Sequence, residues 1–167
     1  MKHILTLFTL AAFAFSASAT EKIEGGFGLK LGDSFEPSGS RFLAEDADAF
    51  EFTPKVANPA FSTYVVFITP NSHQIYRILA ISKPLESGTG FEQSNTILAL
   101  IHRKYGIGPF RGANAISQGQ RKVSVNNNGA GTPAFTFRLS YTDENLSTQA
   151  SEERLDNKLK GANADGI

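Results

Sequence analysis

The chain contains no cysteine, no tryptophan and only one methionine. Without cysteine it forms no disulfide, offers no thiolate to a metal ion and has no cysteine that could carry a lipid anchor. Small exported domains commonly add disulfides to an insufficient core. This chain must therefore be held together by packing, for which its fourteen phenylalanines supply large apolar side chains.

A long apolar run is present only at the N-terminus. The basic start Met1–His3 is followed by the apolar run Ile4–Phe15 and by Ala17–Ala19, which has the A-x-A pattern of a cleavage site. These are the three parts of a secretory signal peptide, and the run is shorter than the ~18 residues typical of a transmembrane helix. We predict cleavage after Ala19 and export to the periplasm of a bacterium or to its exterior, two destinations that stay open.

Neither sign of charge dominates the chain. It holds 16 basic and 16 acidic residues, and loss of Lys2 with the signal peptide leaves a net charge of −1. Nothing in this balance indicates a nucleic acid or an anionic membrane as partner. The length predicts one domain, residues 20–160, between the signal peptide 1–19 and a flexible tail, residues 161–167.

The stretch "EGGFGLKLGDSF", residues 24–35, is rich in glycine and invites comparison with a phosphate-binding loop. A dinucleotide fingerprint needs a third glycine where Leu31 stands and a helix directly after it. Pro37 and Gly39 interrupt that helix, and no G-K-[ST] sequence of a P-loop is present. We therefore predict no nucleotide site and no cofactor.

The same stretch alternates apolar and small or polar residues. Phe27, Leu29 and Leu31 have the period of two of a β-strand, with Gly32-Asp33 as the turn that ends it. We predict the first strand of the sheet here. Its glycines would let another backbone or an aromatic ring come close.

Two hairpins and one short strand are predicted farther along. The first hairpin joins 63–69 to 74–82 across a Pro-Asn turn and supplies the central strands. The second joins 123–125 to 135–141 across Asn-Asn-Asn-Gly. Phe50–Phe52 is a short strand that follows a predicted surface loop at 36–47.

Two helices complete the prediction. A capping box at Thr89–Glu92 begins an amphipathic helix that ends at Tyr105, with Gly106 as its cap. Asp143 caps a charged helix that runs to about Lys160. The fold class is α+β: an antiparallel sheet of five or six strands, with the amphipathic helix packed on one face and a charged C-terminal helix.

Groups suited to catalysis are few. The chain after the signal peptide holds only His73 and His102, without the spacing of a zinc site. Acidic residues that could supply a pair for glycoside chemistry are Glu45, Asp46, Asp48 and Glu51. A loop with this many acids is usually solvated, so we predict no catalytic and no metal-binding residue. A small periplasmic hydrolase using acidic residues with His73 or His102 remains an alternative.

A set of basic residues is the predicted partner-binding group. It consists of Arg103, Lys104, Arg111, Arg121 and Lys122. If these residues converged on one edge of the fold, they would bind an acidic partner. The first two also suit the end of a helix, where cations complement the dipole.

Four stretches carry a likeness to a known group of proteins. They are the GxFGLKLG-type opening "GFGLKLGDSF" after the signal peptide, "YVVFITPNSHQIYRI", a helix ending in "KYG", and "YTDENL" before a charged helix. With them the chain resembles small uncharacterised exported bacterial proteins. The resemblance implies a periplasmic α+β protein and no particular reaction.

The leading functional prediction is a non-enzymatic periplasmic protein. A well-patterned core with few chemical groups favours a binding, inhibitor-like or immunity-like protein that docks a protein of the cell envelope through a sheet face or a loop. A third hypothesis is an apolar small ligand bound beneath the phenylalanine-rich sheet, which requires a cavity.

Overall fold

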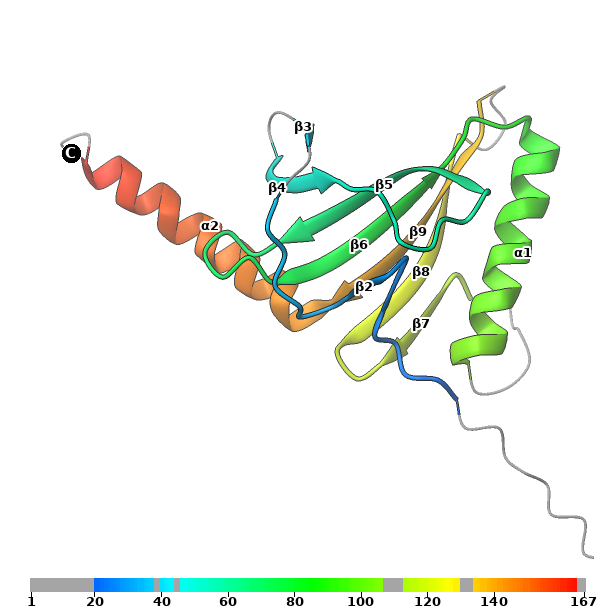
Figure 1. The fold of residues 1–167 in the computed structure, drawn as a ribbon, viewed down its shortest axis with the longest axis horizontal. Coiled ribbons are helices and arrows are strands. Elements are labelled where there is room, and N and C mark those ends of the chain that lie inside the picture. The colour runs from blue at the N-terminus through cyan, green and yellow to red at the C-terminus, as the bar shows by residue number, and fades with distance from the viewer. Residues whose placement is uncertain (1–19, 38–39, 44–45, 107–112, 130–133, 165–167) are drawn as a thin grey trace, which may run out of the picture.

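The computed structural model describes residues 20–37, 40–43, 46–106, 113–129 and 134–164 (Figure 1). The predicted signal peptide and its cleavage site at 1–19 lie outside the described residues. The α+β class is confirmed, but the predicted five or six strands are wrong, because the main sheet has seven. Its strands are β3 (Arg41–Leu43), β4 (Asp46–Glu51), β5 (Phe61–Ile68), β6 (Ile75–Ser82), β7 (Ala115–Gln118), β8 (Arg121–Asn128) and β9 (Thr136–Asp143).

The large sheet has the order β3-β4-β5-β6-β9-β8-β7, and every neighbouring pair is antiparallel. Both predicted hairpins form, and they join in the middle of the sheet, where β6 pairs with β9. The two additional strands, β3 and β7, are the edges. They have only three and four residues, so neither is long enough to give a periodic apolar signal in the sequence.

The inner face of the sheet, as we name it, carries Val66, Ile78, Val123 and Leu139. Their alternation places Val65, Leu79, Ser124 and Ser140 on the opposite, outer face. The inner face is covered by the N-terminal segment and by α1 (Ser87–Tyr105), which packs against β7, β8 and β9 (Figure 1).

Helix α1 begins two residues before the predicted cap. The carbonyl of Glu86 already accepts the N–H of Gly90, so the first turn includes Thr89. Glu86 occupies the cap position without a side-chain hydrogen bond. The predicted capping box at Thr89 is therefore wrong, because that residue lies inside the first turn. The predicted end at Tyr105 is confirmed.

Helix α2 (Glu144–Ala164) follows β9 directly. Its predicted cap is confirmed, since Leu146 N–H donates to Asp143 Oδ1 at 3.2 Å. The helix continues through residues 161–164, where a tail was predicted, because one exposed glycine costs a helix only about 1 kcal/mol. Ala150 is buried on the outer face, and the second half of α2 extends away from the sheet (Figure 1).

The glycine-rich opening is a hairpin of its own rather than a strand of the main sheet. Strand β1 (Gly25–Gly26) pairs with β2 (Leu29–Lys30), and Phe27-Gly28 forms the turn between them. Both turn residues have a positive φ, 59° and 89°, which is the conformation of a tight two-residue hairpin turn. Prediction of a single strand is wrong because the alternation of apolar residues passes straight through this turn.

Candidate functional site

The N-terminal segment is fixed to the inner face by Arg121. Its guanidinium donates to the carbonyls of Ile23 at 3.3 Å and Leu31 at 3.1 Å, the residues that flank the small hairpin. It also pairs with Asp143 Oδ2 at 3.5 Å. The hairpin is thus held at both ends by one side chain from β8.

The hairpin places the ring of Phe27 among three aromatic rings of the inner face. Its centroid lies 4.9 Å from that of Tyr64, 5.7 Å from Phe61 and 6.2 Å from Tyr141, all edge to face. A left-handed backbone costs a phenylalanine about 1–2 kcal/mol. The aromatic contacts offset that cost, each contributing about 0.5–1.5 kcal/mol beyond burial.

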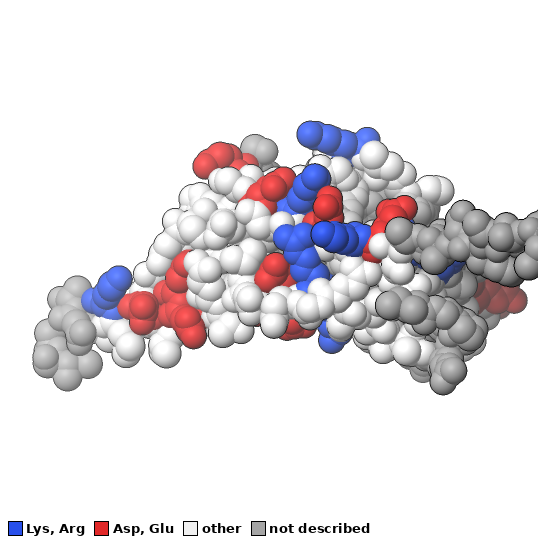
Figure 2. All heavy atoms as spheres, turned by 90° about the horizontal axis from the view of Figure 1, so that it is seen from below, with Lys and Arg blue, Asp and Glu red and all other residues white. Residues whose placement is uncertain are grey.

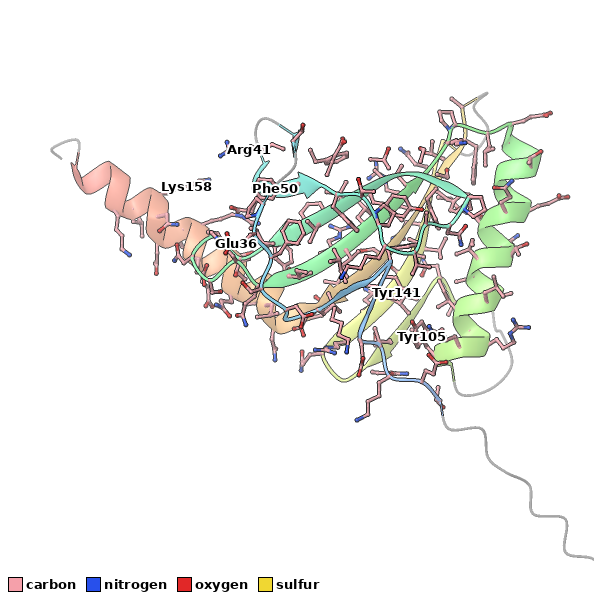
Figure 3. All side chains as sticks on the ribbon, in the orientation of Figure 1. Glu36, Arg41, Phe50, Tyr105, Tyr141 and Lys158 are labelled. Atoms are coloured by element: carbon pink, nitrogen blue, oxygen red, sulfur yellow. The ribbon has the colours of Figure 1, made fainter. Side chains whose placement is uncertain are left out.

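Glycine at position 26 has a packing role. A Cβ built there would lie 2.6 Å from the Tyr141 ring, so only glycine lets the hairpin sit this close to the sheet. The prediction that an aromatic ring approaches this glycine-rich stretch is confirmed. Tyr141 lies between the hairpin and α1, where its ring meets that of Tyr105 with centroids 6.3 Å apart (Figure 3).

Beside the hairpin lies an open groove of about 480 Å³. One wall comes from the N-terminal segment and the other from the end of β4 and the residues after it. Its lining residues are Phe27, Leu29, Phe35, Glu51, Phe52, Thr53 and Lys55. Four of these residues are apolar and three are polar or charged, and a groove of this size with such a lining is typical of a ligand or side-chain binding site.

Two charged residues line the groove. Glu51 and Lys55 are both exposed, and neither makes an ion pair with another described residue. The stem of Lys55 lies over Gly28, where a Cβ would be 2.7 Å from the Lys55 Cβ. The groove is therefore lined mainly by apolar side chains, with Glu51 and Lys55 as its charged residues.

The members of the predicted cationic group that the structure describes do not assemble into one patch. Arg103 is exposed in the last turn of α1, and Lys104 pairs with Glu21 at 3.3 Å. Arg121 is occupied by the N-terminal segment on the inner face, while Lys122 alternates to the outer face. Arg111 lies outside the described residues. Acidic and basic side chains are interspersed on the face shown in Figure 2.

The two histidines lie far from each other. His73 is in the β5–β6 turn, which contacts α2 through the bond from Asn71 N–H to Glu153. His102 is in the last turns of α1, and its Nε2 lies 2.8 Å from the carbonyl of Ala113. Figure 1 shows α1 at the right of the sheet and that turn at the left, beside α2. Neither histidine lines the groove.

Of the acidic residues proposed for hydrolysis, the structure describes the side chains of Asp48 and Glu51. Asp48 pairs with Arg154 of α2 at 2.7 Å, and Glu51 stands at the groove. Glu45 and the side chain of Asp46 lie outside what the structure describes. Among the described residues, no group of histidine and acidic side chains has the arrangement of a metal site.

Sequence reasoning missed the groove, although a signal existed. Phe35 and Phe52 stand next to polar, proline-containing stretches, where a large apolar residue is unexpected. Their convergence depends on the hairpin fold of residues 25–30, which brings one chain segment beside the end of β4. Long-range contact of this kind is not encoded in local periodicity.

In the described part, neither helix is long and apolar enough to cross a membrane. Comparison with protein-family models, with curated proteins and with solved structures finds no match.

Proposed function

We propose that this chain is a non-enzymatic binding protein of the bacterial envelope. It is exported by its signal peptide and docks a protein partner, which inserts a large apolar side chain into the groove beside the N-terminal hairpin. The observation that supports this most directly is the groove of about 480 Å³ with four apolar side chains along it.

The chemistry of the groove suits an apolar anchor of a protein. Energetically dominant contacts in protein interfaces are aromatic or aliphatic side chains that fill a pocket ringed by polar groups. Phe27, Phe35 and Phe52 supply the apolar walls, and Glu51 and Lys55 provide charged groups beside them. The rigid backing of Phe27 by Tyr64 and Phe61 keeps one wall in place before binding.

An apolar small molecule is the second candidate for the same groove. Its volume lies within the ~300–1,000 Å³ typical of small-molecule sites. The hydrolase alternative has less support, because the described histidines line no part of this groove. The experiment must therefore distinguish a protein partner from a small molecule bound in the same groove.

A photo-crosslinking residue in place of Thr53 tests the proposal in the producing cell. Thr53 is exposed at the groove, so a benzophenone side chain there reaches an occupant without disturbing the core. The same residue in place of Thr89, exposed in the first turn of α1, is the matched control. We expect one discrete protein adduct from position 53 and none from position 89.

Exchanging the charges of Glu51 and Lys55 tests whether the adduct arises from specific docking at the groove. In E51K/K55E these charges are exchanged while the net charge is kept, and we expect the adduct at position 53 to decrease several-fold. Absence of a protein adduct, combined with a co-purified molecule that native mass spectrometry detects and F35S releases, would replace this proposal with the small-ligand function. An adduct equally strong from both positions would contradict it.

A further inference from the structure

The groove beside the N-terminal hairpin lies along a part of β4 that no described strand flanks on one side. Pairing of β4 with the β3 segment ends at Glu51, whose N–H donates to the carbonyl of Ser40 at 2.9 Å. The next residue, Phe52, still donates its N–H to the carbonyl of Tyr64 in β5 at 3.1 Å. The chain of β4 therefore stays paired with β5 after its pairing with β3 has ended.

Thr53 presents unpaired backbone groups at this position. The backbone groups of successive residues point alternately to the two sides of a strand. Since the N–H of Phe52 faces β5, the N–H and C=O of Thr53 face away from β5. Neither group makes a hydrogen bond with a described residue, and Thr53 is exposed and lines the groove. One donor and one acceptor thus lie beside the apolar side chains of the groove.

These two groups suit the backbone of an extended segment. In an antiparallel pair, one residue exchanges both of its hydrogen bonds with the residue opposite. A segment that pairs in this way with Thr53 would also continue the pattern of the main sheet, in which every neighbouring pair is antiparallel. In such strand addition, main-chain bonds give affinity and pockets for alternate side chains give specificity.

The register of an added segment would place its next side chain in the groove. After the residue opposite Thr53, the following residue lies opposite Phe52, and side chains of opposite residues share one face of the sheet. The ring of Phe52 lies 6.0 Å from that of Tyr64 on the inner face, and it lines the groove together with Phe27 and Phe35. The residue opposite Phe52 is therefore the apolar anchor.

We propose that the groove binds an extended segment of a protein, which adds to β4 in the antiparallel direction at Thr53. This inference rests on the proposed function, to which it adds the conformation and the sequence pattern of the partner. Lys55 and Glu51 favour an acidic residue before the Thr53 partner and a basic residue after the anchor. The segment leaves β4 after the anchor, because the N–H of Glu51 is already bound to Ser40.

An extended segment fits this groove better than a helix or an apolar small molecule. A helix satisfies its own backbone groups internally, and an apolar molecule has neither a donor nor an acceptor. Either occupant would cover the N–H and C=O of Thr53 without pairing them, which is unfavourable. An extended segment pairs both groups and fills the groove with one side chain.

Titration of the ¹⁵N-labelled protein, residues 20–167, with the peptide GSDTFKS tests this inference by NMR. The threonine of the peptide is designed to lie opposite Thr53, and its phenylalanine is the anchor. We expect saturable shifts of the Thr53 amide signal. Hydrogen exchange of this amide should slow by about fivefold or more in the complex, because its N–H gains a partner.

Methylation of the peptide backbone separates strand addition from side-chain binding alone. An N-methyl group on the threonine of the peptide removes the N–H that Thr53 C=O accepts, and the dissociation constant should rise about tenfold. An N-methyl group on the phenylalanine is the matched control, since that N–H points away from β4. It should change the dissociation constant by less than about twofold.

Protein variants then test the groove itself. F35S removes an apolar wall and should weaken binding several-fold, whereas F91S, at an exposed phenylalanine of α1, should leave it unchanged. E51K/K55E should bind the charge-reversed peptide GSKTFDS more tightly than GSDTFKS. This preference is a second reading that does not depend on a change in the apolar wall.

The outcomes distinguish this inference from the proposed function on which it rests. Equal effects of the two methyl groups, with binding still weakened in F35S, would overturn strand addition and leave the groove as a docking site. An absence of saturable binding would also overturn the inference, while the protein adduct from position 53 tests separately whether a protein occupies the groove. Unchanged binding in F35S and in E51K/K55E would contradict both.

Discussion

The two faces of the sheet differ in how the same strands are used. On the inner face, β8 and β9 present Val123, Val125, Phe137 and Leu139 to α1 and the N-terminal hairpin. On the outer face the same two strands present hydroxyl, amide and cationic side chains, and among the described elements α2 packs against β9 there. One pair of strands thus supplies the core on one side and a polar surface on the other.

The inner face contributes most of the stability, whereas the exposed outer residues contribute little to it. Burial of apolar area on the inner face contributes the driving force of folding, about 25 cal/mol for each Å². Exposed polar residues usually change stability by less than about 0.5 kcal/mol when they are replaced. Replacing two adjacent residues of one strand should therefore change the free energy of unfolding by very different amounts. Such neighbouring pairs are the sharpest test of the difference between the faces.

The largest contrast is expected between Phe137 and Arg138. Phe137 is fully buried, and its ring meets that of Phe61 edge to face at 5.5 Å. F137A should lower the free energy of unfolding by about 3–5 kcal/mol, through lost burial and a cavity. R138A, one residue away on the outer face, should stay within about 0.5 kcal/mol. Urea unfolding measures both, and equal effects would contradict the division between the faces.

Two glycines of α1 give the next contrast. A Cβ at Gly90 would lie 2.2 Å from the Phe135 ring, whereas nothing lies within 4 Å of a Cβ at Gly88. G90A should destabilise the fold by about 1–3 kcal/mol, because the helix must move away from the inner face. G88A should stabilise it by up to about 1 kcal/mol through lower backbone entropy of the unfolded chain. Thermal unfolding of the pair measures both signs, and a gain in G90A would show that α1 is not closely packed.

The third contrast sets Arg121 against Lys122. Arg121 binds the carbonyls of Ile23 and Leu31 from the inner face. R121Q should cost about 1–2 kcal/mol and increase hydrogen exchange in residues 23–31, because the small hairpin loses its anchor. K122Q should leave both measurements unchanged. Unaltered exchange in R121Q would mean that packing of Phe27 alone holds the segment.

These contrasts also explain what the sequence predicts and what it leaves out. Hairpin β5–β6 and helix α1 are predicted because their apolar residues repeat at the period of one element. The alternation of Phe135, Phe137 and Leu139 likewise predicts one buried face of β9. Local patterns therefore predict well where a single element buries one face.

The errors arise where the fold depends on distant partners. The Phe27-Gly28 turn interrupts an apparently regular strand, because Phe27 adopts a positive φ to reach Tyr64 and Phe61. Arg121 and Lys122, adjacent in sequence and predicted to act together, are separated by strand alternation. The groove likewise depends on strand order, which local periodicity does not contain.

The smallest expected effect concerns Tyr141, on the inner face between the hairpin and α1. Burial raises the pKa of its phenol, and the neighbouring Tyr105 adds to this rise. An unfolded tyrosine ionises near pH 10, so only the unfolded state loses this proton as the pH rises above about 10. Stability is therefore complete below pH 10 and falls above it, by about 1 kcal/mol at pH 11. In Y141F this loss should diminish, and urea unfolding between pH 8 and pH 11 measures the difference. An identical alkaline loss in Y141F would place the titrating group elsewhere, and Y105F is the matched variant that identifies the contribution of the adjacent ring.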